Sequence, residues 1–391
     1  MTATKLRWLL VVPALILVAY IARGALRSGC DTAQAQSKLP DSVENPPATI
    51  HSDQAFAKLK NKSTLKSLVA EGSGITDKGL QNLKDLPQLT DLLIRSDSVS
   101  DAGLKNISSL HALKKLFVFC DGKVTDTTLK TAGASKLLEE LVVSGADTTD
   151  KGLSDIDHLS NLTFLAIENG KLNGSGLSEL SKLPKLELLS LIGNEITGAS
   201  LSKLQPLKLI SLTINDNPIG DTGVENIAKM KSLRVTLNLE HTGITKASLP
   251  VLAKMPNFTN LSLAHNNLAS AQFFLLKRMP QLGRLRLCEC ALTDDSLKEI
   301  GKLDRLAVLD LSNDPLQHDT ERHRDQKHPL QFRNKIDEKG LYYLVGMKAL
   351  RRLNLDYINP SMDCLRKLQR ALPSCRFKIT TNPQQGEAQP D

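Results

Sequence analysis

The stretch LTDLLIRSDSVSDAGLKNISSLHA, residues 89–112, is one copy of a unit that recurs along most of this chain. Its first half has apolar residues at Leu89, Leu92 and Ile94, and the two-residue step from Leu92 to Ile94 puts both side chains on one face of a strand. Its second half starts VSDAGL at Val99 and fits a short helix, because a Ser or Thr followed by an acidic residue favours a helix start. The unit therefore predicts a strand followed by a short helix.

The second leucine of this unit returns at a nearly constant interval. Most copies are 23 to 25 residues apart, and the positions are Leu68, Leu92, Leu116, Leu141, Leu165, Leu189, Leu212, Leu237, Leu261, Leu285, Leu309 and, after a longer step of 44 residues, Leu353. Self-similarity at such a period is the signature of a repeat protein, in which each unit buries its apolar face against its neighbours. The longer step equals one ordinary repeat plus an insertion of 20 residues.

The conserved spacing within the units resembles that of the leucine-rich repeat family. The pattern L-x-x-L-x-L-x-x-N is present at Leu186–Asn194, at Leu209–Asn217 with one leucine replaced by isoleucine, and at Phe258–Asn266 with Phe in the lead position. The second half, GITDKGL at residues 74–80, is similar to the ribonuclease-inhibitor-like and cysteine-containing subclasses. The resemblance implies an α/β fold: a right-handed solenoid of about 12 repeats, curved like a horseshoe, with a parallel β-sheet on the concave face. The repeat is short, so we expect short or partly 3₁₀ helices on the convex side.

The beginning of the chain has the pattern of a targeting segment. Lys5 and Arg7 precede an apolar run from Trp8 to Ala22, as in a secretory signal peptide. The run is shorter than the ~20 residues of a typical spanning helix. A cleaved signal and an uncleaved anchor that contacts the membrane both stay open, with lipidation at Cys30 as a third route. All three predict that the repeats lie outside the cytoplasm, either membrane-anchored or secreted.

The limits of the repeat pattern divide the chain into five parts. We expect a signal peptide or membrane anchor at residues 1–30, a flexible linker at 31–49, an N-terminal capping half-repeat at 50–64, the repeat domain at 65–379 with its insertion at 317–335, and a disordered tail at 380–391. An atypical terminal repeat covers the exposed end of a solenoid.

The cysteines have a structural rather than a catalytic pattern. Cys290 stands where other repeats have the asparagine that closes the motif, so we expect it to fill the same structural position. Cys364 and Cys375 flank the last expected helix. They could form a disulfide in an oxidising compartment or remain two buried thiols, and the sequence leaves both open.

Side chains that alternate with the buried leucines are expected on the concave face. In the first half of the domain they are apolar, and we predict an exposed patch that binds a partner: Phe117, Phe119, Phe164, Leu188 and Ile192. In the second half they are basic, and the predicted partner contacts are Arg284, Arg286 and Arg352. Exposed apolar patches often mark interaction sites, although packing between neighbouring strands could hide this one.

A row of polar residues is expected where successive strands end. It contains Asp216, His241, His265 and Glu289, and the nearby insertion contributes His318, His323 and His328. Imidazole and carboxylate groups together suit zinc or a similar divalent metal. The other interpretations are a solvated polar edge and a loop that contacts a partner.

The sequence thus supports two hypotheses of different kinds. The first is a non-catalytic, extracytoplasmic scaffold that recognises a protein or polymer through its concave face and strand ends. The second is a divalent-metal site, possibly with metal-dependent activity, at the His/Asp/Glu row.

The chain contains no G-x-S-x-G, H-E-x-x-H or phosphate-binding glycine loop. We therefore expect a monomer without enzymatic activity or cofactor. Its net charge of +8 weakly favours acidic partners, while few aromatic residues and the targeting pattern argue against nucleic acid.

Overall fold

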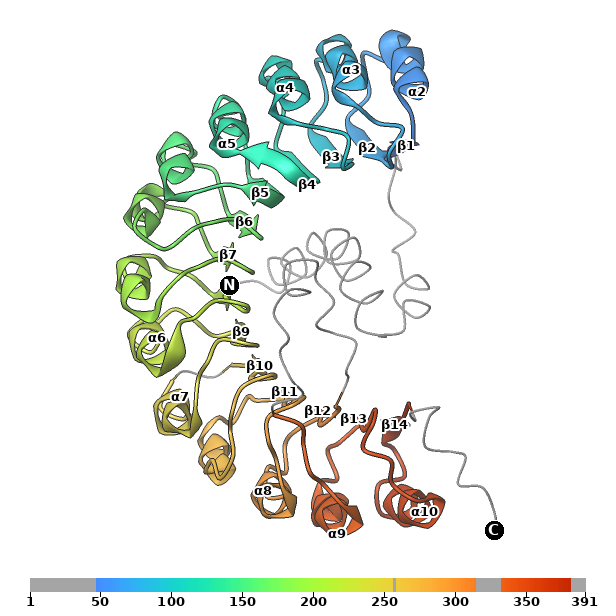
Figure 1. Ribbon diagram of the computed structural model, residues 1–391, viewed down its shortest axis with the longest axis vertical. Coiled ribbons are helices and arrows are strands. Elements are labelled where there is room, and N and C mark those ends of the chain that lie inside the picture. Colours follow the sequence, from blue (N-terminus) through green and yellow to red (C-terminus); the bar gives the residue numbers. More distant parts are fainter. Residues whose placement is uncertain (1–46, 256–257, 314–331, 381–391) are drawn as a thin grey trace, which may run out of the picture. The chain divides into compact units, whose positions relative to one another are not determined.

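The structure, a computed structural model, describes residues 47–255, 258–313 and 332–380. These residues form one parallel sheet of 14 strands in which each strand pairs with the next along the chain (Figure 1). The strands are β1 Ala48–Ile50, β2 Ser67–Glu71, β3 Asp91–Arg95, β4 Lys115–Thr125, β5 Glu140–Asp147, β6 Phe164–Glu168, β7 Leu188–Ser190, β8 Ser211–Thr213, β9 Thr236–Asn238, β10 Asn260–Ser262, β11 Arg284–Arg286, β12 Val308–Asp310, β13 Arg352–Asn354 and β14 Arg376–Lys378. The leucine-rich repeat solenoid predicted from the sequence is confirmed.

Short helices lie on the outer side of the arc that the strands line (Figure 1). The α-helices are α2 Asp53–Ala57, α3 Asp77–Leu80, α4 Asp101–Leu104, α5 Asp126–Gly133, α6 Gly220–Ile227, α7 Leu249–Leu252, α8 Asp294–Ile300, α9 Glu338–Tyr342 and α10 Met362–Ala371. The 3₁₀ helices are η3 Lys58–Asn61, η4 Gln81–Asp85, η5 Lys105–Ser109, η6 Asp150–Asp155, η7 Leu177–Lys182, η8 Gly198–Leu204, η9 Lys246–Ser248, η10 Phe273–Arg278 and η12 Tyr343–Gly346. The expected mixture of short α and 3₁₀ helices is therefore present. Within the described ranges, no helix combines the length and the apolar composition needed to cross a membrane.

The strand register confirms the alignment of the repeats. Leu92 pairs with Leu116, and Leu261 pairs with Leu285, so the second leucines form one continuous row. Their side chains belong to a single hydrophobic core that extends along the described repeats. Two strands lie beyond the leucine pattern: β1 includes two residues that we assigned to the linker, and β14 follows the last repeat.

Hydrogen bonds join several helix starts to the preceding repeat. Ser100 caps α4 by accepting from the N–H of Ala102. It also donates from its N–H and its hydroxyl to the two carboxylate oxygens of Asp77, at 2.7 and 2.6 Å. Thr125 binds Asp101 in the same way. The expected pattern of a Ser or Thr before an acidic residue does mark helix starts, because the N-cap residues of five helices are Thr76, Ser100, Thr125, Thr149 and Thr293. The acidic residue after the cap, which we expected only to favour the helix start, is also the acceptor that holds the next repeat at Asp77 and Asp101.

The asparagine that closes each motif satisfies buried backbone groups of the turn. The amide nitrogen of Asn266 donates to the carbonyls of Leu239 and Leu263, and its Oδ1 accepts from the N–H groups of Thr242 and Ile244. Asn194 and Asn217 make equivalent bonds. Cys290, in the same position, is buried and its Sγ lies 3.2 Å from the Leu263 carbonyl oxygen. Its structural role is therefore confirmed.

The insertion ends earlier than we predicted. We expected it to continue through Lys335, but Asn334 occupies the asparagine position of its repeat. Asn334 accepts from the N–H groups of Cys290 and Leu292 and donates to the carbonyls of neighbouring turns. Lys335 forms a parallel bridge with Thr293. Both residues thus belong to the regular solenoid, and residues 314–331 lie outside the described part.

Candidate functional site

The concave face consists of side chains at alternate strand positions, arranged in rows across the sheet. We call the first-position residues of β11 to β14 the first row, and the register gives them as Arg284, Val308, Arg352 and Arg376. The second row lies two residues further along each strand and contains Arg286, Asp310, Asn354 and Lys378. Neighbouring positions in a row are about 4.8 Å apart, the spacing of strands in a sheet. The rows therefore bring together residues that are far apart in sequence.

The apolar patch is less exposed than we expected. Phe117 and Phe119 are buried, with only 6% and 4% of their surface exposed. Their neighbours in the sheet cover part of each ring, because Phe117 pairs with Val142 and the Arg95 guanidinium lies 5.4 Å from the centre of the Phe119 ring. The prediction that these two rings are exposed is wrong. Phe164, Leu188 and Ile192 are half-buried and form the accessible part of the predicted patch.

A buried ion pair borders this apolar region. Lys115 Nζ lies 2.9 Å from Glu140 Oε1, and the two residues pair across β4 and β5. Burial raises the pKa of the Glu140 carboxyl above its ordinary value, and the hydrogen bond from Lys115 only partly opposes this shift. The pair therefore contributes a largely enclosed charge rather than an open carboxylate.

Arg286 is the centre of a second charged cluster. Its guanidinium lies 2.6 Å from Glu240 Oε1 and 3.3 Å from Asp310 Oδ2. The hydroxyl of Ser262 donates to Glu240, and that of Ser312 donates to Asp310. Glu240, then Asp310, raises the pKa of Arg286 above its usual value. We predicted that Arg286 contacts a partner, but these internal ion pairs give it a role in fixing the sheet surface.

The other predicted cations remain accessible. Arg284 and Arg352 are exposed, and so is Arg376, a basic residue of the C-terminal copy that the leucine pattern does not place on the concave face. Arg376 was missed because β14 lies beyond the last recurring leucine, so the repeat alignment did not assign it to the concave face. The pairing of Arg352 with Arg376 in the register identifies it.

The polar row at the strand ends has a backbone explanation. Asp216, His241, His265 and Glu289 all have positive φ, between 48° and 58°. Other repeats have glycine at the equivalent position, as at Gly193 with φ 63°. This turn therefore requires the left-handed conformation, which Asp and His adopt more readily than most other non-glycine residues. The four side chains align because their four repeats make the same turn.

The row divides into two separate pairs. His241 Nδ1 lies 3.0 Å from Asp216 Oδ1, and His265 Nδ1 lies 3.4 Å from Glu289 Oε2. His241 thus faces the carboxylate of the repeat before it, and His265 faces the carboxylate of the repeat after it. Across residues 47–255, 258–313 and 332–380, no three His, Cys, Asp or Glu side chains gather in a way that could hold a metal ion. The insertion histidines, His318, His323 and His328, lie outside the described residues.

The described cysteines are all buried, and three of them are free thiols: Cys290, Cys364 and Cys375. Of the two alternatives for the last pair, the structure therefore contains the unpaired one. Burial raises the pKa of the Cys290 thiol well above its ordinary value, and it raises that of Cys375 to about 11. Thiols with raised pKa values are poor nucleophiles.

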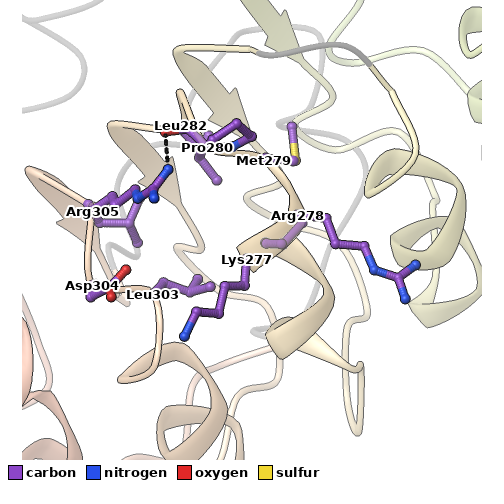
Figure 2. Close-up of a pocket in the computed structure, with 10 residues that line it drawn as sticks. Lys277, Arg278, Met279, Pro280, Leu282, Leu303, Asp304 and Arg305 are labelled. Carbon is purple, nitrogen blue, oxygen red and sulfur yellow. Dashed lines mark hydrogen bonds between the residues drawn. The ribbon is translucent and has the colours of Figure 1, made fainter.

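A small pocket lies between two adjacent repeats, in the segments that precede β11 and β12 (Figure 2). It has a volume of about 310 Å³, and its lining is Leu276, Lys277, Arg278, Met279, Pro280, Leu282, Leu303, Asp304, Arg305 and Leu306. Arg305 donates to the carbonyl of Pro280 at 3.4 Å. The volume is at the lower limit for a small-molecule site, so the pocket does not suggest a substrate cavity.

Comparisons with known proteins found one family model and several solved structures. The Leucine Rich repeat family model matches residues 206–228. The fold is similar to that of an internalin from Listeria monocytogenes, with a TM-score of 0.51, 22% identity and coverage of 75% of each chain. It is also similar to a leucine-rich repeat protein of Leptospira interrogans, with a TM-score of 0.38, 18% identity and coverage of 84% of this chain and 99% of that one. An internalin C2 from L. monocytogenes has a TM-score of 0.40 and 23% identity, covering 53% of this chain and 82% of that one.

No curated protein matches the sequence. The likeness to the first internalin shows the fold alone at this level of identity. The recurring motif, the matched repeat and the sheet with one parallel strand per repeat together identify the chain as a leucine-rich repeat protein.

Proposed function

We propose that this protein is a non-catalytic, extracytoplasmic scaffold that binds a protein partner across its concave face and strand ends. The observation that carries the proposal is the chemical division of that face. Half-buried apolar side chains, Phe164, Leu188 and Ile192, lie around β6 and β7. Exposed Arg284 and Arg352 lie on β11 and β13. Protein interfaces combine apolar anchors with arginine contacts in this manner.

The state of the reactive side chains supports a binding role over catalysis. The thiol of Cys290 is enclosed in a turn and its pKa is raised by burial. His241 and His265 occupy turn positions and face carboxylates of neighbouring repeats. These groups have structural roles in holding one repeat against the next. Because one fold can host many functions, the argument rests on these contacts and not on the fold alone.

The proposed location rests on the N-terminal sequence pattern. Lys5 and Arg7 before the apolar run from Trp8 to Ala22 have the order of charge and hydrophobicity that export signals share. A protein exported in this way meets its partner outside the cytoplasm, whether it is released or stays attached.

Site-specific photo-crosslinking tests the proposed binding face. A photoreactive phenylalanine analogue replaces Leu188, on the concave face, in the full chain made by its own host cell. The matched control places the same group at Phe274, which lies in η10 on the outer side and is 44% exposed. We expect illumination to link position 188, and not position 274, to one protein of defined mass.

Equal crosslinking at the two positions, or a product at position 274 alone, would contradict the concave-face assignment. A product at position 188 that forms only between two copies of this chain would replace the separate partner with self-association.

A further inference from the structure

The first row at the end of the sheet has an excess of positive charge. Arg352 and Arg376 are exposed on neighbouring strands, and Arg284 is exposed two strands before Arg352. Only the half-buried Val308 stands between them in the row. This part of the first row therefore contains three guanidinium groups and no carboxylate.

The acidic residues of the adjacent surface are already paired with other cations. Glu240 and Asp310 bind Arg286, and Asp356 Oδ2 lies 2.9 Å from Lys378 Nζ. Arg352 and Arg376 form no ion pair with any residue in the described ranges. Their charge is thus available to an external group.

We infer that this row binds an extended acidic segment of a protein partner, with carboxylates held by Arg352 and Arg376. This assignment rests on the proposed protein-binding function and adds the chemistry of the partner. The planar guanidinium matches a carboxylate with two parallel hydrogen bonds. The Arg286 cluster on the same face also binds carboxylates through a guanidinium group, with one nitrogen near Glu240 and another near Asp310.

The spacing of the row fits an extended chain. Arg352 and Arg376 lie on neighbouring strands, about 4.8 Å apart at the spacing of a sheet. Side chains on one face of an extended peptide recur about every 6.8 Å, so two acidic residues at alternate positions lie within reach of the two long arginine side chains. The concave positions of β11 to β14 contain no aromatic side chain, and a nucleic acid strand would have no platform on which to stack its bases.

Peptide binding to the full chain tests the inference. The probe is a fluorescent twelve-residue peptide of alternating Glu and Ser, measured by anisotropy at low salt, with a Gln and Ser peptide as the uncharged control. We expect the double substitution Arg352→Gln, Arg376→Gln to raise the Kd at least tenfold. The matched control is Arg366→Gln, Arg370→Gln, which removes the same charge from exposed positions on α10. We expect it to change the Kd less than twofold.

Equal weakening by both double variants would overturn the inference, because long-range attraction to a cationic protein would then explain binding. No difference between the Glu and Gln peptides would overturn it as well. A sulfated oligosaccharide that binds more tightly than the Glu peptide and depends on the same two arginines would show that the partner class is wrong. Thermal unfolding confirms that each variant is folded. If the double variant Arg352→Gln, Arg376→Gln does not fold, the single variant Arg352→Gln is measured in its place. Crosslinking at position 188 does not depend on these arginines. The proposed protein-binding function can therefore be correct even if the inference of an acidic partner is wrong.

Discussion

At the scale of single residues, the contacts between repeats depend on glycines, which leave room for the neighbouring repeat, as much as on hydrogen bonds. A methyl group on Gly103 would lie 2.3 Å from Oδ1 of Asp77 and 2.7 Å from its Cα. Both distances are too short for real contacts, and the second involves a backbone atom that cannot rotate away. Asp77 also accepts the two hydrogen bonds from Ser100. The glycine in the recurring S/T-D-x-G sequence, present at residues 76–79, 100–103 and 149–152, is therefore part of the repeat interface.

We expect Gly103→Ala to destabilise the protein by ~1–3 kcal/mol, the usual cost of overpacking a tight contact. Denaturant unfolding measures this as a lower midpoint. The matched control is Gly346→Ala, because a methyl group there meets no atom within 4 Å. Since alanine favours helical backbone over glycine, the control should leave the midpoint unchanged or slightly raise it. Identical midpoints for the two variants would show that the repeats can move apart to accommodate the methyl group.

At the scale of the elements, the residues on either side of the insertion are hydrogen-bonded to each other. Asn313 Nδ2 donates to the carbonyl of Asn334, and the Asn334 N–H donates to Asn313 Oδ1, at 2.9 and 2.7 Å. These bonds hold the two ends of the insertion together. Asn334 then supplies the turn contacts that an uninterrupted repeat obtains from its own asparagine.

Removal of residues 314–331, with a short Gly-Ser link in their place, should therefore leave the solenoid folded with a nearly unchanged unfolding midpoint. Removal of residues 314–335 is the control, since it also deletes Asn334 and leaves the Cys290 and Leu292 N–H groups without their acceptor. Buried unsatisfied groups cost about 1–3 kcal/mol each, so this longer deletion should unfold at lower denaturant. A similar loss in both deletions would mean that the insertion itself supports the fold.

At the scale of the whole molecule, the sequence predicts the structural features that recur from repeat to repeat. It does not predict the features that depend on contacts with neighbouring side chains. The leucine spacing predicted the sheet register, and the asparagine motif predicted the structural position of Cys290. The exposure of Phe117 and Phe119 was predicted wrongly because alternation identifies the side of the sheet but not the cover that adjacent side chains provide. The row from Asp216 to Glu289 follows the strand ends, but its positive φ values, which explain the alignment in part, are not visible in a sequence pattern. Arg376 was missed because its strand lacks the leucine that marks the others.

The whole solenoid also gives a prediction about its stability. One hydrophobic core connects the repeats from Ile50 to Cys375, and Cys364 and Cys375 are free thiols near its end. A core that is continuous between repeats stabilises the chain through contacts between neighbours, without a cross-link at the end. We therefore expect the denaturant midpoint of protein purified without reductant to stay the same when reductant is added. Cys364→Ser is a poor substitute for this experiment, because it buries a hydroxyl in an apolar site. A midpoint that falls with reductant, together with loss of two reactive thiols in the untreated unfolded protein, would show that Cys364 and Cys375 form the disulfide that the sequence left open.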